Sequence, residues 1–240
     1  MKSIYDLQTI IEQELSNINI PKTPENLYKP IDYVIGLGGK RMRPILVLIA
    51  HQLFDTDLKK ALAPALGIEV FHNFTLLHDD IMDNAPLRRS KKTVHEKWNN
   101  NTAILSGDTM LVHAYQLISD VDKSILKEVL SVFNKAATQV CEGQQWDMDF
   151  ETQENVQLAD YMKMIENKTA VLLAASLQIG GITAGASKEN QNNLYHFGLN
   201  MGIAFQLKDD LLDAFGNTDE FGKQIGGDIM ANKKTFLYLK

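Results

Sequence analysis

The chain has 240 residues, of which 45% are hydrophobic and 22% are charged, as is ordinary for a globular protein. Its formal net charge of -6 argues against a general binder of nucleic acid or of anionic membranes, since such proteins gather positive charge. The single cysteine, Cys141, excludes an intramolecular disulfide and is typical of a reducing compartment. The N-terminus has no apolar signal core, and no apolar run is long enough to span a membrane. We therefore expect a cytoplasmic protein.

Apolar residues recur at helical spacing along most of the chain, beginning with Ile4, Leu7, Ile11 and Leu15. Further helices are predicted to begin near Pro24 and Pro44 and to cover 61–83, 101–119, 123–150, 157–179 and 188–215. No alternating run indicates a strand, and we find no linker. The sequence therefore predicts a single all-α domain over 1–240. Its apolar end has no stop signal, which indicates that the sequence is cut inside a helix.

A glycine-rich stretch at 36–39 is followed at once by three cations, Lys40, Arg41 and Arg43. Glycines at this spacing predict a mobile or tightly turned loop. The cations and the loop amides could together bind an anion. A run of cations is more often a solvated surface, and both interpretations stay open from this stretch alone.

Two acidic stretches each hold carboxylates in a D-D-x-x-D pattern, at 78–83 and 206–213. An α-helix advances about 100° per residue, so Asp79 shares a face with Asp83, and Asp209 with Asp213. Like charges one turn apart repel, so we expect bound cations to offset the repulsion between these carboxylates. Oxygen ligands without cysteine or paired histidine favour Mg²⁺ over zinc or copper. We therefore expect two facing helices that clamp metal ions and a polyphosphate.

Cationic groups accompany the first acidic stretch. Arg88 and Arg89 follow it and can contact phosphate oxygens directly. His72 lies two turns before Asp79 on the same face, where it suits a phosphate contact, although a lone histidine there is more often a packed residue. Lys168 and Thr169 lie between apolar runs, and Lys223, Lys233 and Lys234 follow the second stretch.

Gly198 and Gly202 lie on the face of the second acidic stretch, as does Gln206. Each glycine inside a helix costs about 1 kcal/mol relative to alanine, so each is expected to have a steric purpose. Close helix packing and room for a substrate beside Gln206 are equally good explanations.

These carboxylates and cationic side chains together fit a reaction in which diphosphate is the leaving group. Metal ions and cationic side chains stabilise the charge of a departing diphosphate, and apolar helix interiors can shelter a carbocation from water. Hydrolysis fits less well, since no residue stands out as a base for water. Ionisation of an allylic diphosphate fits best.

At this point the chain resembles the trans-isoprenyl diphosphate synthases, or polyprenyl synthetases, over nearly its whole length. The resemblance rests on motifs that occur in one order: 38–44, His72 with 78–83, 88–89, 107–108, 143–144, 168–169, 205–213, and Lys223 through Gly226 and Asp228 to Lys233. Each motif alone is weak, but the ordered set is highly specific.

The resemblance implies an all-helical, single-domain bundle around a deep central cavity, in a homodimer that binds three Mg²⁺ ions. It implies that metal is ligated by Asp79, Asp83 and Asp209, with support from Asp80, Asp210 and Asp213. The allylic diphosphate would be held by Arg88, Lys168, Thr169, Gln206, Lys223 and Lys233. Isopentenyl diphosphate would be held by Lys40, Arg43, His72 and Arg89, with Arg41 beside them. Catalysis would then depend on Asp79, Asp80, Asp83, Arg88, Lys168, Asp209, Asp210 and Lys223.

The implied reaction ionises the allylic C–O bond and joins the isopentenyl double bond head to tail, giving a short-chain product of about C15 to C20. Phe74 and Thr75 are expected to form the floor for the growing tail, and a lone aromatic at Phe74 looks like a geranylgeranyl diphosphate synthase. Two features depart from the family. Ser90 and Lys92 replace its usual Gly and Pro, and the family runs well past Lys240.

Three rival interpretations remain. A terpene cyclase would share the fold but would normally replace the second aspartate motif and would not need Lys40, Arg43 and His72. A non-catalytic subunit would not need intact carboxylates in both motifs. A helical bundle with a structural metal would consume no isopentenyl diphosphate.

Overall fold

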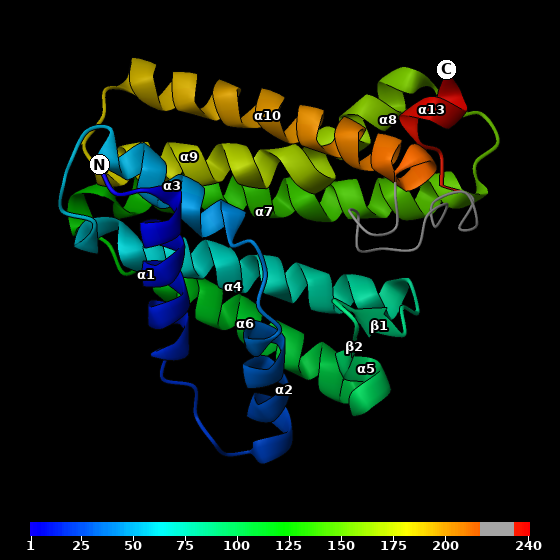
Figure 1. Cartoon of the computed structure of the whole chain (residues 1–240), viewed down its shortest axis with the longest axis horizontal. Helices are drawn as coiled ribbons and strands as arrows, with labels where there is room; N and C mark the ends of the chain where they lie inside the picture. The colour runs from blue at the N-terminus through cyan, green and yellow to red at the C-terminus, as the bar shows by residue number, and fades with distance from the viewer. Residues whose placement is uncertain (217–232) are drawn as a thin grey trace. The chain divides into compact units, whose positions relative to one another are not determined.

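The structure is a computed structural model that describes residues 1–216 and 233–240 (Figure 1). These residues group into two compact units. The first comprises Met1–Leu130 with Ile179–Ala186, and the second comprises Ser131–Gln178 with Ser187–Lys240. Apart from one short hairpin, the regular structure of the described residues is helical, so the predicted all-α class is confirmed. A single domain around a central cavity stays a prediction.

The first unit is built around the long helix α4. Its elements are α1 (Ile4–Ser16), α2 (Glu25–Gly36), α3 (Met42–Gln52), α4 (Lys59–Met82), β1 (Leu87–Arg88), β2 (Lys91–Lys92), α5 (Val94–Lys97) and α6 (Asn100–Ile118). Helix α6 runs alongside α4, and α3 packs on α4 as well (Figure 1). Ile68 and Phe71 of α4 and Met110 of α6 are fully buried. Burial of such side chains stabilises the unit and holds α4 rigidly.

The basic loop after α4 is a β-hairpin, so the prediction that no strand forms is wrong here. Strands β1 and β2 pair antiparallel, with Leu87 opposite Lys92 and Arg88 opposite Lys91. The two turn residues, Arg89 and Ser90, have φ values of 52° and 61°, as a two-residue type I′ turn requires. This turn was not predicted because a type I′ turn normally contains Asn or Gly, and Arg89 and Ser90 are neither.

The second unit contains the last part of α7 (Lys123–Thr152), then α8 (Leu158–Ile165), the π-helix η1 (Glu166–Ala170), the first part of α9 (Val171–Thr183), α10 (Lys188–Phe215) and α13 (Phe236–Leu239). Helix α10 packs on η1, and α13 packs on α8 and α10. The π-helix interrupts the helix that the sequence predicts over 157–179. Such π-segments occur frequently at functional sites.

Gly198 and Gly202 let α10 approach its neighbours closely. A Cβ atom on Gly202 would lie 2.5 Å from the Cα of Ala170, and one on Gly198 would lie 2.7 Å from the Cα of Ala174. Those distances leave no space for a side chain. Of the two explanations for these glycines, close helix packing is therefore confirmed.

Candidate active site

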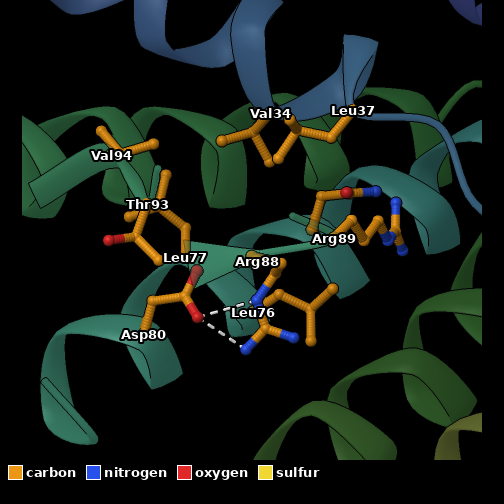
Figure 2. Close-up of a pocket in the computed structure, with 10 residues that line it drawn as sticks. Val34, Leu37, Leu76, Leu77, Asp80, Arg88, Arg89, Thr93 and Val94 are labelled. Carbon is orange, nitrogen blue, oxygen red and sulfur yellow. Dashed lines mark hydrogen bonds and ion pairs between the residues drawn. The ribbon is translucent and has the colours of Figure 1, made fainter. Parts of the chain in front are cut away.

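The first acidic motif ends α4. Asp79 and Asp80 lie in the last turn, and Asp83 is the residue at which the helix stops. Asp80 is buried and faces the hairpin, where Nε and Nη2 of Arg88 each lie 2.7 Å from its Oδ1. Figure 2 shows this pair inside a small pocket that also contains Leu77, Arg89 and residues of α2. Arg88 Nη2 also lies 3.4 Å from Asp79 Oδ2.

The charge of this motif is partly balanced inside the protein. Burial raises the pKa of Asp80, an effect that the hydrogen bond and charge of Arg88 reduce. For Arg88, burial acts to lower the pKa, but Asp80 and Asp79 outweigh burial and raise the pKa above its ordinary value. Arg88 is therefore a permanent cation beside the motif. A guanidinium has five N–H donors, so Arg88 can hold Asp80 and still donate to a phosphate.

A second group of cations gathers between the glycine-rich loop and α4. Arg43 Nη1 lies 3.0 Å from His72 Nε2. The guanidinium of Arg89 lies against Gly39, where a Cβ would be only 2.7 Å from Arg89 Nη1. Gly39 also has a φ of 142°, a conformation that favours glycine. We call Arg43, His72 and Arg89, together with Lys40, which follows Gly39 in the chain, the cationic cluster.

Protonation states in the cationic cluster follow from burial and mutual repulsion. Burial, followed by the charge of Arg43, lowers the pKa of His72 well below its ordinary value. Neutral His72 accepts from Arg43 at Nε2, because a guanidinium only donates, and its proton is then on Nδ1. Burial lowers the pKa of Arg43 to about 10, so Arg43 still carries its charge at neutral pH. Within the described part of the chain, its buried Nε finds no acceptor.

The side chain of Arg41 is bound by protein acceptors. Arg41 has a φ of 48° and is only 3% exposed. Burial, followed by the charge of Arg41, lowers the pKa of the nearby Arg89. Nη1 of Arg41 lies 2.8 Å from Glu69 Oε1, Nε lies 2.9 Å from Glu12 Oε1, and Nη2 donates to the carbonyl of Ile35 at 2.8 Å. Asn73 Nδ2 also donates to Glu69 Oε1, at 3.2 Å. These contacts hold Arg41 within the protein, and its place beside the substrate stays a prediction.

Phe74 and Thr75, the predicted floor for the product tail, lie one turn before the first motif. The Phe74 ring is buried, with its centroid 5.6 Å from that of Phe71 and 4.8 Å from that of His78. Thr75 is half-buried, and its hydroxyl donates to the carbonyl of His72 at 2.8 Å. Their role in product length stays a prediction.

The second acidic motif lies near the end of α10, and its middle carboxylate is enclosed by protein donors. Asp210 accepts from the Tyr161 hydroxyl, from Gln206 Nε2 at 3.0 Å and from the Phe236 amide at 3.3 Å. Gln206 in turn accepts from the Thr169 hydroxyl at 3.0 Å. The structure thus joins Thr169, Gln206 and Asp210, three of the predicted residues, in one hydrogen-bonded chain.

Two predicted diphosphate ligands, Lys168 and Lys233, meet at one buried carboxylate. Their Nζ atoms lie 2.6 and 3.3 Å from the same oxygen, Oδ2 of Asp147. Burial acts to raise the pKa of Asp147, but the two lysines outweigh it and hold the pKa below its ordinary value. Lys223, a further predicted ligand, lies outside the described residues. Asp209 is half-buried and Asp213 is buried on α10.

Among the residues of these sites that the sequence-based prediction missed are Glu69, Asp147 and Tyr161. A signal existed for Glu69, because a carboxylate inside an apolar run is seldom buried without a partner. Asp147 and Tyr161 reach their partners only through folding, across 21 and 49 residues of sequence. Neither lies in a local pattern that marks it.

The donor atoms of the aspartate motifs fit Mg²⁺. Among the described residues, no three His, Cys, Asp or Glu side chains gather closely enough to hold a metal by themselves. Mg²⁺ usually takes only one or two carboxylates and completes its shell with water and substrate phosphates. Asp79 with Asp83, and Asp209 on α10, can supply such carboxylates.

An all-helical chain that carries two aspartate motifs, each near cations suited to phosphate, has the features of an enzyme acting on diphosphates. The family model described as polyprenyl synthetase matches residues 24–240. The chain belongs to the polyprenyl synthetase family, which confirms the predicted class of trans-prenyltransferase.

Named relatives agree with this family. The chain is 41% identical to the geranylgeranyl diphosphate synthase of Methanosarcina mazei over 90% of its own length and 67% of the relative. It is 38% identical to the geranylfarnesyl diphosphate synthase of Natronomonas pharaonis, over 99% of this chain and 75% of the relative. A crystal structure of a geranylgeranyl pyrophosphate synthase superposes with a TM-score of 0.97 at 50% identity, covering 100% of this chain and 73% of that one. None of the described helices could cross a membrane.

Proposed function

We propose that the protein condenses isopentenyl diphosphate head to tail with an allylic diphosphate, in a Mg²⁺-dependent reaction that releases diphosphate. The observation that carries this proposal is the cationic cluster, where the charged Arg43 has a buried Nε without an acceptor among the described residues. A buried donor without a partner costs about 1 to 3 kcal/mol. A bound anion would satisfy it.

Isopentenyl diphosphate is the substrate that suits the cationic cluster. It keeps its diphosphate throughout the reaction, so its site needs cations that bind without promoting departure. Neutral His72 would donate from Nδ1, and Arg43 and Arg89 would contribute guanidinium groups with two parallel N–H donors. Lys40 lies at the exposed edge of the same loop. The adjoining Glu69 forms its ion pair with Arg41.

The allylic diphosphate suits the aspartate motifs, Lys168 of η1 and Lys233. Bound Mg²⁺, which we expect as three ions, would offset the negative charge on the departing group. Asp79, Asp83 and Asp209 would hold the ions, and Asp80 and Asp213 would support them. Arg88, Lys168 and Lys233 would donate to phosphate oxygens, with Thr169 and Gln206 fixing their surroundings and Lys223 as a further ligand.

Ionisation and condensation follow from this arrangement. Cationic side chains that are fixed before the reaction stabilise charge as it develops on the leaving diphosphate. The allylic cation is then attacked by the isopentenyl double bond, and the departed diphosphate takes the proton. Apolar helix faces would keep water from the cation.

Product length is proposed as about C15 to C20, from the large Phe74 before the first motif. The named relatives include both geranylgeranyl and geranylfarnesyl diphosphate synthases, so their names alone do not choose a length. Phe74→Ala removes the proposed floor. We expect longer products from this variant by chromatography, and unchanged products would exclude Phe74 as the floor.

We further propose that the protein acts as a cytoplasmic homodimer. Leu105, Val112 and Tyr115 follow one face of α6 and are 59, 57 and 37% exposed. An apolar stripe of this kind suits contact with a second copy. Sedimentation of wild type and Val112→Glu tests this, since the charged variant is expected to sediment as a monomer.

The decisive experiment incubates purified full-length protein with Mg²⁺, labelled isopentenyl diphosphate and each of dimethylallyl, geranyl and farnesyl diphosphate. Chain-elongated products are expected, and their chromatography reports primer choice and length together. A protein that forms no elongated product with any primer would refute the proposal. A terpene cyclase would instead release hydrocarbon from an allylic diphosphate alone.

A further inference from the structure

The middle aspartate of the second motif is bound entirely to protein. Asp210 is only 4% exposed, and Tyr161, which donates to it, is 2% exposed. Its Oδ2 accepts from the Tyr161 hydroxyl and the Phe236 amide, and its Oδ1 accepts from Gln206. A carboxylate has about four acceptor sites. Three donors from three separate segments therefore occupy most of what Asp210 can offer.

The contact with Phe236 joins the motif to residues 233–240. This segment also packs through Phe236 and Leu239 on the apolar cluster around Tyr161, Met164 and Ile165. The rings of Tyr161 and Phe236 are 6.5 Å apart. One residue, Tyr161, therefore both holds Asp210 and supports the segment that Asp210 binds.

The same segment carries Lys233, whose Nζ lies 3.3 Å from Asp147 Oδ2, beside Lys168. Phe236 lies three residues after Lys233, so a contact that fixes the Phe236 backbone also limits where Lys233 can reach. Two buried carboxylates, Asp147 and Asp210, thus bind the segment at Lys233 and at Phe236.

We propose that Asp210 is the docking point for residues 233–240 and not a metal ligand, and that Tyr161 is a positioning residue that keeps Asp210 turned toward this segment. The proposal rests on the proposed function, because its consequence is the placement of Lys233 for the allylic diphosphate. The proposal gives different roles to two carboxylates that are adjacent in sequence. Asp209 binds the metal, and Asp210 binds residues 233–240 and so keeps the site folded.

Hydrogen exchange tests the docking contact without substrate or metal. In the metal-free protein, Tyr161→Phe and Asp210→Asn each remove one part of the contact while keeping side-chain size. We expect amide exchange in the peptide that covers 233–240 to be at least about fivefold faster in both variants, as for opening of a less stable local unit. Tyr195→Phe, a tyrosine change on α10 outside this contact, is the matched control. Unchanged exchange in both variants would overturn the proposal.

Kinetics then separates docking from metal binding. We expect Tyr161→Phe and Asp210→Asn to raise KM for the allylic diphosphate about tenfold, with KM for isopentenyl diphosphate and the half-saturating Mg²⁺ concentration unchanged. Asp209→Asn is expected to raise the half-saturating Mg²⁺ concentration. If Asp210→Asn shifts the Mg²⁺ dependence as Asp209→Asn does, Asp210 is a metal ligand. If wild type makes no product, the proposed function fails, while the exchange experiment still decides the docking.

Discussion

Removing one partner of the buried ion pair between Arg41 and Glu69 is expected to cost more stability than removing one partner of any exposed pair of the first unit. Glu69 is 2% exposed, and Glu69→Gln removes its charge while keeping its size. Removing one partner of a buried pair costs about 3 to 5 kcal/mol. Glu12 and the Ile35 carbonyl still contact Arg41, and glutamine can accept one hydrogen bond. We therefore expect the lower value, a loss of about 3 kcal/mol in the free energy of unfolding.

Glu12→Gln is the matched control, because it neutralises the other carboxylate that contacts Arg41. The Glu12 side chain is 42% exposed, so its loss is expected to cost at most about 1 kcal/mol. Urea denaturation of both variants, with the slope m compared to wild type, measures the two costs. If the losses in free energy of unfolding for Glu69→Gln and Glu12→Gln agree within about 0.5 kcal/mol, burial does not determine how much each carboxylate stabilises Arg41, and the prediction is wrong.

The same substitution has a functional consequence. Arg41 lies between Lys40 and Arg43, and its buried side chain holds the backbone from which both extend. We expect Glu69→Gln to raise KM for isopentenyl diphosphate about tenfold, equivalent to about 1.4 kcal/mol, with KM for the allylic diphosphate unchanged. A lower KM for isopentenyl diphosphate would mean that the loss of a nearby negative charge matters more than loop geometry.

Three further predictions concern stability. Burial lowers the pKa of His51 from its ordinary 6.5. Between the folded and unfolded pKa values of His51, the unfolded chain binds more protons than the folded one. The free energy of unfolding should therefore fall as pH drops through 6.5. His51→Gln should flatten this dependence in urea titrations from pH 8 to 5. Ser90→Gly should stabilise the protein by about 1 kcal/mol, because Ser90 has a φ of 61°; no rise in melting temperature would contradict this. Gly202→Ala should cost about 1 to 3 kcal/mol, whereas Gly36→Ala, with open space around it, should cost nothing measurable.

The sequence predicted well those features that depend on neighbours along the chain. Helical spacing located the long helices, and the D-D-x-x-D pattern placed Asp79 and Asp83 at a helix end. The residue types near them indicated diphosphate chemistry. Each of these inferences uses only the regular geometry of a helix and the charge of adjacent residues.

The burial and the partners of Arg41 could not be predicted from local sequence patterns. In the sequence it is one of three equivalent cations after a glycine pair. In the structure its side chain is buried, and its guanidinium binds Glu69 and Glu12. Its partner Glu69 is 28 residues away along the chain, and a buried ion pair over that distance is decided by tertiary packing. The same reason hides the contact between Tyr161 and Asp210.

One helix, α4, carries Glu69, His72, Phe74 and Asp79. The number of residues between any two of them therefore determines their distance along the helix axis. His72 and Asp79 are separated along the axis by about 10 Å, seven steps of about 1.5 Å each. Inserting or deleting one residue between them would rotate one group by about 100° relative to the other. This stretch is therefore expected to vary by substitution and to reject changes of length, whereas the loop before α4, which carries no predicted site residue, can change length more freely.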